Sequence, residues 1–529
     1  MEKQSEREQD DVIAFLMRSD AYQNAVGQNA VGTVERLDTH GAIIFLAGDR
    51  AYKLKRAVKL PYLDFSTVEK RRQVCLRELQ LNRRTAPSLY LDMLPIRRAP
   101  DGSLHWGGEG EIADWVIAMK RFPQDALFDR LASAGQLDAA LVQRLADTVR
   151  RFHDGAEQAR AARWLPTLRQ IVETIDETLL SAEAAPLDLQ ASSYLAALRA
   201  ECDRREPLLR QRQEAGYVRR CHGDLHLKNI VLDGGEPVLF DALEFDEDLT
   251  EIDVLYDLAF LLMDLCHRGR GEAANAVLNR YVEQDPAADM LAGNPWAGLA
   301  LLPFFLSLRA GIRAMVGVHG LGFVAEAGKA DAGHAIRDYL ALARDALTAK
   351  PPVLVCVGGF SGSGKTTVAR ALAPAIGALP GAIHLRTDVE RKRMFGAEPT
   401  TRLDASAYTA AVGDEVYSRV LEKASRILRA GHSAVIDAVF SEAPHRALAD
   451  SAADKVGAAF IGLWLDADPE QMAARVEQRR GDASDATREV VSRQVRANAG
   501  PPPAWTRVDA RAGIEETLIR ANEALRPPR

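Results

Sequence analysis

The spacing of hydrophobic residues changes character twice along the 529-residue chain. Residues 31 to 56 hold two short apolar runs, AIIFLAG and RAYKLK, whose alternation predicts an antiparallel hairpin. A helix is expected from Ser66 to Arg84, and further strand signals follow up to DWVIAMK at residues 114 to 120. From Ala126 to Ala349 the periodicity is mostly helical.

One hairpin is expected inside this helical region, at IVLDGGEPVLFD, where Gly-Gly supplies the turn. The pattern therefore predicts a small β-rich lobe at about residues 30–125 and a helical lobe at about 126–345. This bilobal α+β arrangement is typical of a protein-kinase-like fold.

The clearest joint is TAKPPV at residues 348 to 353, where two prolines end a helical stretch. Strand and helix signals alternate after it, with five expected strands at VLVCV, AIHL, SAVID, AFIGLWLD and TRVDA. This alternation predicts an α/β domain with a parallel sheet and helices on both faces. We therefore expect two domains, residues 1–350 and 351–529.

Composition narrows the class of protein. Hydrophobic residues at 47% and charged residues at 27% match a globular chain, and the net charge of -7 indicates no general polyanion-binding surface. The charged N-terminus lacks the apolar core of a secretory signal, and the apolar run WAGLALLPFFLSL is too short to span a bilayer. Five scattered cysteines form no CxxC pair, so we expect reduced thiols, no zinc site and a cytoplasmic protein.

The segment GGFSGSGKTT, residues 358 to 367, has the Walker A spacing. Such a loop turns backbone N–H groups onto phosphate, Lys365 supplies a positive charge, and Thr366 offers a hydroxyl to magnesium. We expect the nucleotide to contact the whole loop, which comprises Gly359, Phe360, Ser361, Gly362, Ser363, Gly364, Lys365, Thr366 and Thr367. The loop follows an expected strand and precedes a helix, as its mechanism requires.

Further polar residues accompany this loop. Asp388 lies just past the second expected strand with Arg391 three residues on, and Asp437 ends the third strand, as a Walker B carboxylate does. Arg475 and Arg479 stand four apart and share a helix face. Residues 351 to 510 thus resemble the small P-loop kinases of the zeta-toxin, gluconate kinase, chloramphenicol phosphotransferase and polynucleotide kinase group.

That resemblance implies roles for the flanking residues. Asp388 would contact the acceptor hydroxyl as a base, Arg391 would help to hold the acceptor, and Asp437 would be a metal ligand. Arg475 and Arg479 would belong to a lid over the phosphates, although a solvated helix face is the alternative.

A second set of phosphoryl-transfer residues precedes the joint, in CHGDLHLKNIVLDGGEPVLFD at residues 221 to 241. Asp224 and Asn229 have the spacing of a kinase catalytic loop, and the hairpin returns Asp241 beside Asn229. Phosphoryl transfer needs one carboxylate to orient the acceptor hydroxyl, and an amide with a second carboxylate to hold magnesium.

The HGD form, together with DVLYDLAFLL at residues 253 to 262, resembles the aminoglycoside phosphotransferase and choline kinase-like superfamily. The resemblance covers about residues 30 to 345. It implies that Asp224 is the base and that Asn229 and Asp241 are metal ligands. His222 would buttress the loop, whereas His153 at a helix end is interpreted as structural.

The small lobe should also supply a lysine to ATP. Lys53 and Lys55 lie on the same face of one strand, and we prefer Lys53, with Glu78 as its partner and a surface glutamate as the alternative. No GxGxxG loop occurs in residues 31 to 52, which makes a protein substrate a poor fit. The acidic cluster at residues 244 to 253 is interpreted either as a cradle for a cationic substrate or as a solvated turn.

The sequence thus predicts a bifunctional ATP- and Mg2+-dependent kinase that acts on small hydroxyl-bearing molecules. One alternative is a P-loop kinase with an upstream regulatory nucleotide-binding module, favoured by the absent Gly-rich loop. The other is a polynucleotide end kinase, against which stand the acidic balance and the lack of an aromatic–basic stripe. The acceptors and the oligomeric state stay open.

Overall fold

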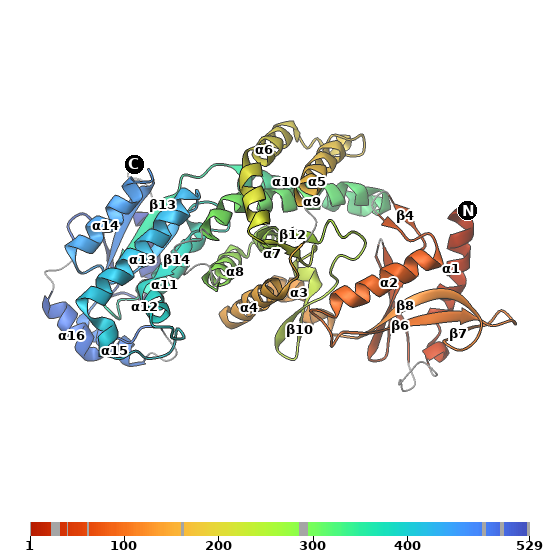
Figure 1. Ribbon diagram of the computed structural model, residues 1–529, viewed down its shortest axis with the longest axis horizontal. Coiled ribbons are helices and arrows are strands. Elements are labelled where there is room, and N and C mark those ends of the chain that lie inside the picture. Colours follow the sequence, from red (N-terminus) through yellow and green to blue (C-terminus); the bar gives the residue numbers. More distant parts are fainter. Residues whose placement is uncertain are drawn as a thin grey trace. The chain divides into compact units, whose positions relative to one another are not determined.

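The computed structural model describes residues 2–22, 32–39, 41–60, 63–159, 163–284, 295–478, 483–497 and 502–525. These residues form two compact units: Met1–Thr167 with Gly216–Leu261, and Leu168–Ala215 with Leu262–Arg529. Figure 1 colours the chain from its N-terminus in red to its C-terminus in blue. Residues 262–350, which precede the expected joint, pack in the same unit as the P-loop half, so the domain boundary at residue 350 stays a prediction.

The first unit contains the expected small lobe. Its sheet has the order β1-β2-β3-β8-β6-β7 and is antiparallel at every pairing. The strands are β1 Glu35–Asp38, β2 Ala42–Ala47, β3 Arg50–Lys55, β6 Tyr90–Arg98, β7 Leu104–Trp106 and β8 Glu111–Lys120. The predicted hairpin is confirmed as β2 and β3, in which Ile44 lies opposite Lys53.

Helix α2, Val68–Asn82, packs on this sheet (Figure 1). Its first turn is capped by Thr67, whose side chain accepts a hydrogen bond from the N–H of Lys70. The helix is two residues shorter at each end than the sequence pattern predicts. Helix α1, Glu2–Leu16, which the pattern did not predict, packs beside β8.

The rest of the unit surrounds the loop that carries Asp224. The predicted hairpin is confirmed as β10 Ile230–Asp233 and β11 Glu236–Leu239, with a Gly-Gly turn. A second small ribbon, β9 Val218–Arg220 with β12 Glu251–Asp253, was not predicted. This unit also contains α3 Phe128–Ser133, α4 Ala139–Gly155 and the 3-10 turn Leu227–Asn229.

The region from Ala126 to Ala349 is mostly helical, as predicted. Its further helices are α5 Trp164–Leu179, α6 Ser192–Glu214, α7 Val254–His267, α8 Gly271–Glu283, α9 Leu302–Gly320 and α10 Lys329–Leu347. Within the described ranges, Trp296–Gly320 is the one segment long and apolar enough to cross a bilayer, and 72% of its most apolar window is buried in the protein. That burial is the property of a core helix.

The second unit contains a five-stranded parallel sheet of order β14-β15-β13-β16-β17. Its strands confirm all five predicted segments: β13 Val353–Gly358, β14 Ile383–Arg386, β15 Ala434–Asp437, β16 Ala459–Asp466 and β17 Thr506–Asp509. The helices are α11 Lys365–Leu372, α12 Thr387–Met394, α13 Ala410–Arg429, α14 Ala443–Asp454, α15 Pro469–Gln478, α16 Arg488–Ala497 and α17 Ile514–Ala524.

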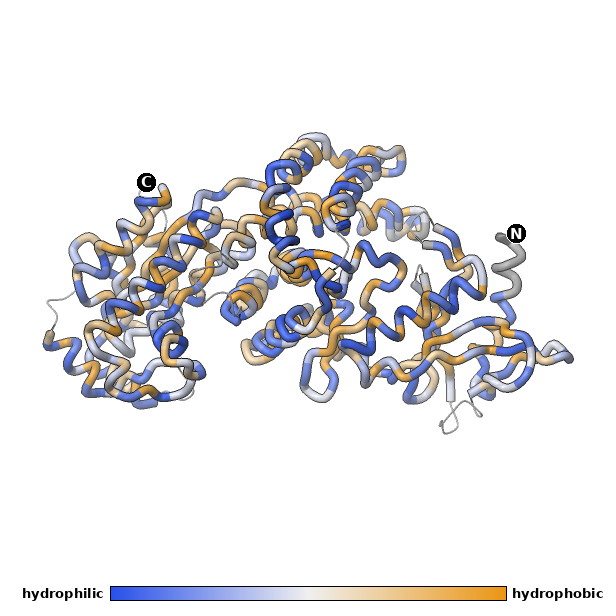
Figure 2. Tube along the Cα trace, viewed as in Figure 1, coloured by the Kyte–Doolittle hydropathy of each residue, from blue (hydrophilic) through white to orange (hydrophobic). Residues whose placement is uncertain are grey.

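Helices cover both faces of this sheet because side chains alternate along each strand. Val355 and Val357 of β13 pack in one cluster with residues of α11, α15, α16 and α17. Helices α13 and α14 contact each other and the same strands (Figure 1). Figure 2 shows hydrophilic and hydrophobic residues alternating along such helices. The carboxyl ends of β13, β14 and β15 therefore present the P-loop, Asp388 and Asp437 at one edge of the sheet.

Candidate active sites

The first candidate site forms where β9 leads into the loop of Asp224. The 3-10 turn Leu227–Asn229 folds Asn229 back, and its amide nitrogen donates to the Asp224 carboxylate at 2.8 Å and to the Asp224 carbonyl at 3.0 Å. The predicted spacing thus brings the acid and the amide into direct contact. Because the amide nitrogen is committed to Asp224, the amide oxygen is the atom suited to bind a cation.

The hairpin then returns Asp241 to the same place. The N–H of Phe240 donates to the carbonyl of Asn229 at 3.0 Å, so the two segments are joined just before Asp241. Asp241 has φ 60°, a left-handed conformation that costs an aspartate about 1 kcal/mol or more. Carboxylate and amide oxygens held together in this way suit a hard divalent cation.

Asp257, at the start of α7, fixes the backbone of the catalytic loop. Its carboxylate accepts hydrogen bonds from the N–H of His222 at 3.0 Å and of Gly223 at 2.9 Å. Gly223 has φ 83°, and a Cβ there would lie 3.1 Å from the carbonyl of Leu249. Only glycine therefore fits this turn of the loop.

Two buried histidines support the same loop. Nε2 of His222 lies 3.0 Å from the carbonyl of Phe240, which ties the Asp224 loop to the Asp241 segment. Burial lowers the pKa of His222, so the ring is neutral near pH 7. Nε2 of His153 lies 3.1 Å from the Asp257 carboxylate, which gives His153 a structural part in orienting Asp257.

Both small-lobe lysines reach Glu78, one on each carboxylate oxygen. Nζ of Lys53 is 2.7 Å from Oε1, and Nζ of Lys55 is 2.5 Å from Oε2 of the fully buried Glu78. Lys53 also pairs with Asp241, whereas Lys55 pairs with Glu244 at 2.5 Å. Of these partners Asp241 is 39% exposed and Glu244 is 10% exposed, so Lys53 faces the open side of the site.

Charge in this network is unbalanced. Burial by itself would lower the pKa of Lys53, but the carboxylates of Asp241 and Glu78 raise it above the usual lysine range. Burial would raise the pKa of Asp241, and Lys53 lowers it instead. Burial raises the pKa of Glu244 despite its contact with Lys55. Three carboxylates share two ammonium groups, which favours the arrival of a further cation.

The second candidate site is the P-loop. Three of its glycines have positive φ: Gly359 at 140°, Gly362 at 86° and Gly364 at 97°. A Cβ on Gly362 would lie 2.4 Å from the carbonyl of Met472, so the loop packs directly against α15. Helix α11 begins at Lys365, which places the loop at a helix N-terminus, a site that favours anions.

The remaining loop residues line the same turn. Phe360 packs edge-to-face on Trp464 with ring centres 5.5 Å apart, and its carbonyl accepts from Nζ of Lys365 at 2.9 Å and from the N–H of Ser363 at 3.1 Å. The N–H of Ser361 donates to the Gln494 side chain of α16 at 2.8 Å. Thr367, by contrast, is exposed on α11.

Asp437 at the end of β15 contacts the P-loop threonine. The Thr366 hydroxyl donates to Oδ2 of Asp437 at 2.5 Å. Nε2 of His384 and Nε of Arg386, both from β14, lie 3.8 Å from the same oxygen. Burial would raise the pKa of Asp437, but His384 and Lys365 lower it to about 2. Asp437 is therefore ionised, and with the hydroxyl it forms a donor pair that suits a divalent cation.

Asp388 and Arg391 lie on α12, which starts directly after β14. Burial, with the charge of Asp437 second, raises the pKa of Asp388. The guanidinium of Arg391 donates to the carbonyl of Ala407 at 2.6 Å and lies 5.0 Å from the centre of the Tyr408 ring. Arg391 therefore borders the segment around Tyr408, which is 46% exposed.

Only one of the two expected lid arginines can be placed. Arg475 on α15 has Nη1 3.5 Å from the carbonyl of Gly362, so it lies beside the P-loop. Arg479 lies outside the described residues.

Several residues in these sites were missed by the sequence analysis. Glu244 was part of the acidic cluster, but its pairing with Lys55 matches neither interpretation of that cluster. The one sequence signal for His384 and Arg386 as site residues is their spacing of two on a strand that ends at the site. Gln494 carries no local signal, because the fold alone brings α16 to the P-loop.

Comparisons with known proteins agree with this division. The family described as "Phosphotransferase enzyme family" (APH) matches residues 105–291, and the "AAA domain" family AAA_33 matches residues 354–501. The uncharacterized proteins Rv2004c of Mycobacterium tuberculosis and Mb2027c of Mycobacterium bovis are each 30% identical over 471 residues, 86% of this chain and 88% of theirs.

Two solved structures each match one part of the chain. An ethanolamine kinase of Plasmodium vivax is 11% identical over 61% of this chain and 84% of its own, with a TM-score of 0.38. The APS kinase CysC of Mycobacterium tuberculosis is 22% identical over 33% of this chain and 98% of its own, with a TM-score of 0.25.

Proposed function

The chain belongs to the protein family of the mycobacterial Rv2004c and is a phosphotransferase that joins an APH-type domain to a P-loop kinase domain; from this premise we propose a bifunctional enzyme. Each domain would transfer the γ-phosphoryl group of ATP to a small molecule with a free hydroxyl. The observation that carries this proposal is the presence of two sets of phosphoryl-transfer side chains that share no residue. One set contains Asn229, which bonds Asp224 and whose backbone is bonded by the residue before Asp241. The other set contains Thr366, which bonds Asp437.

In the upstream site, Asp224 would accept a hydrogen bond from the acceptor hydroxyl and orient it towards the γ-phosphorus. Asn229 and Asp241 would hold Mg2+, which would supply positive charge against the phosphates of ATP. Asp224 is 36% exposed and already oriented by Asn229, so an acceptor can reach it without a large rearrangement.

Lys53 is the lysine that we assign to the phosphates of ATP. Its ammonium group forms an ion pair with Asp241, the proposed metal ligand, whereas the ammonium group of Lys55 pairs with Glu78 and Glu244. If Asp241 holds Mg2+, Lys53 would be released towards the phosphates and would keep its ion pair with Glu78. Lys55 would stay in place, since it compensates two buried carboxylates.

In the P-loop site, the backbone of Gly359–Thr367 would surround the β-phosphate, and Lys365 would leave the carbonyl of Phe360 for the β and γ oxygens. Thr366 and Asp437 would hold Mg2+. Asp388 would accept the proton of the acceptor hydroxyl, and its raised pKa makes it a better base than an ordinary aspartate. Arg391 would hold the acceptor, and Arg475 and Arg479 would close over the phosphates.

We place the enzyme in the cytoplasm, because all five cysteines are free and four of them are buried. The acidic balance of the chain supports small-molecule acceptors over nucleic acid. The regulatory alternative requires that the upstream site bind nucleotide without phosphoryl transfer. The presence there of Asp224 as a base, with Asn229 and Asp241 as metal ligands, favours transfer instead.

A metabolite-library screen with γ-labelled ATP tests the proposal. The whole protein is compared with Asp224→Asn, Lys365→Ala and the double variant, and Asn522→Ala on α17 serves as a surface control. Each single variant should lose one labelled product and keep the other, and the double variant should lose both. A single product lost equally in both variants would refute two independent sites, and labelled RNA ends would favour the polynucleotide alternative.

A further inference from the structure

Strand β14 is an edge strand whose open side is covered by helix α8. In place of a neighbouring strand, two asparagine side chains of α8 bond the backbone of His384 and of Ala382, the residue just before β14. The amides of Asn275 and Asn279 donate to the carbonyl of Ala382 at 3.0 and 3.2 Å. The side-chain oxygen of Asn279 accepts from the N–H of His384 at 2.7 Å. Such pairing satisfies backbone groups that an uncovered edge leaves open.

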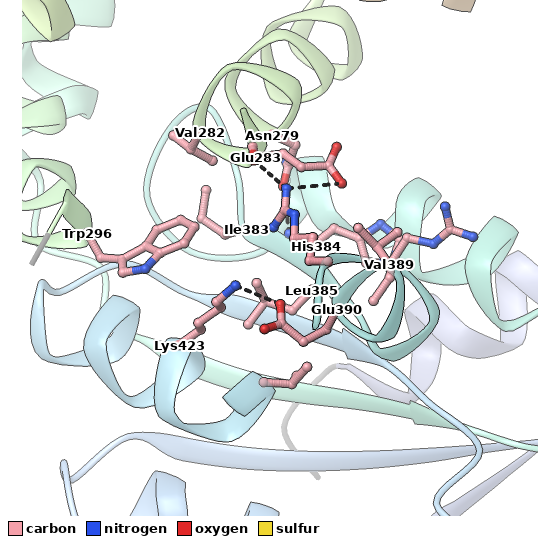
Figure 3. A pocket seen from close by; sticks show the side chains of 13 residues that line it. Asn279, Val282, Glu283, Trp296, Ile383, His384, Leu385, Val389, Glu390 and Lys423 are labelled. Carbon is pink, nitrogen blue, oxygen red and sulfur yellow. Dashed lines mark hydrogen bonds and ion pairs between the residues drawn. The ribbon is translucent and has the colours of Figure 1, made fainter. Parts of the chain in front are cut away.

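Further contacts join α8 to the P-loop half of the chain. Glu283 at the end of α8 lies 3.7 Å from Nη2 of Arg393 on α12. Figure 3 shows the pocket between α8 and β14, with Asn279, Glu283 and His384 on one side and the buried Trp296 on another. A buried ion pair of Lys423 and Glu390, 2.6 Å apart, also lines it. The APH match includes α8, yet α8 packs against the edge strand of the sheet that carries the P-loop.

Two side chains of the covered strand lie next to the proposed metal ligand Asp437, which ends the neighbouring strand β15. His384 and Arg386 are two apart and extend to the same face of β14, where both lie 3.8 Å from Oδ2 of Asp437. The backbone of His384 is the group that Asn279 holds. The position of β14 therefore sets where the side chains of His384 and Arg386 meet the Asp437 carboxylate.

We propose that Asn279, a residue of the upstream kinase half, is a positioning residue for the P-loop site and acts through His384 on Asp437. The inference rests on the proposed function, in which Asp437 and Thr366 hold the Mg2+ of the nucleotide. It makes α8, which lies inside the APH match, a structural part of the P-loop domain.

The test measures Mg2+-dependent nucleotide binding and needs no acceptor. Calorimetric titration with AMP-PNP is run over a range of Mg2+ concentrations on the full chain carrying Asp241→Ala, so that the Mg2+-dependent part reports the P-loop site. Asn279→Ala should raise the Mg2+ concentration for half-maximal effect by about tenfold, the lower end of losses seen for outer partners of metal ligands. Affinity for AMP-PNP without Mg2+ should stay within about twofold, because the P-loop itself is unchanged.

Asn275→Ala and Asn522→Ala are the matched controls. Asn275→Ala loses its bond to Ala382 and its 3.1 Å contact with the Asn279 amide but keeps the bond from Asn279 to His384, and Asn522 lies on α17. Both should leave the Mg2+ midpoint unchanged, and a folded Asn279→Ala with the same midpoint overturns the inference. If Asn279→Ala does not fold, His384→Gln tests the same chain of contacts, and an unchanged midpoint again overturns it. Absence of Mg2+-dependent binding before any Asn279 change would instead refute the proposed function.

Discussion

Replacement of Lys53 and of Lys55 by methionine should have different effects. Lys55→Met should mainly lower the stability of the fold, whereas Lys53→Met should mainly abolish phosphoryl transfer in the upstream site. Methionine keeps most of the side-chain volume and removes the charge. Lys55→Met leaves Glu244, which is 10% exposed, without its lysine partner, and the fully buried Glu78 keeps Lys53 alone. Loss of one partner of a buried ion pair costs about 3–5 kcal/mol, a large share of the stability of a domain.

Lys53→Met should destabilise the fold much less. Glu78 keeps Lys55 as a partner, and Asp241 is 39% exposed and regains contact with water. The expected cost is about 1 kcal/mol, discounted for that exposure. This variant should nevertheless abolish phosphoryl transfer in the upstream site, because it removes the proposed phosphate contact.

Hydrogen exchange of the backbone amides of β3 and α2, followed by mass spectrometry on the full chain, measures this local stability. Lys55→Met should speed exchange by about two to three orders of magnitude, and Lys53→Met by about tenfold at most. Lys120→Met on β8 is the control, because its pair with Asp233 is exposed and contributes little. Faster exchange in Lys53→Met than in Lys55→Met would refute the division of roles.

Three further predictions concern the two reactions. Lys365→Ala should weaken AMP-PNP binding, whereas Asp388→Asn should keep it and lose transfer by about a hundredfold; calorimetry decides, and equal loss of affinity would make Asp388 a nucleotide or metal ligand. Asp241→Ala should abolish the upstream labelled product and leave the other, unless the sites are coupled. Because burial raises the pKa of Asp388, its base form is lost as pH falls through that raised pKa. The acid limb of kcat/KM for the P-loop reaction should lie above the ordinary aspartate range, and a limb that persists in Asp388→Asn would contradict this assignment.

The sequence by itself determined whatever depends on neighbours along the chain. The hairpin that joins Asn229 to Asp241 and the strand, loop and helix around Lys365 follow from spacing, because a few residues between two groups restrict where the chain can go. The five strands of the C-terminal sheet could equally be predicted from the sequence, since buried parallel strands are short apolar runs.

Only the tertiary structure decided which distant side chains meet. Lys55 and Glu244 are 189 residues apart, and Asn279 and His384 are 105 apart. An acidic cluster looks alike in sequence whether water or a buried lysine neutralises it, and an asparagine on a helix does not reveal that it pairs with an edge strand. Burial and long-range packing choose between such outcomes, because the cost of an unpaired polar group arises only once the fold has excluded water from it.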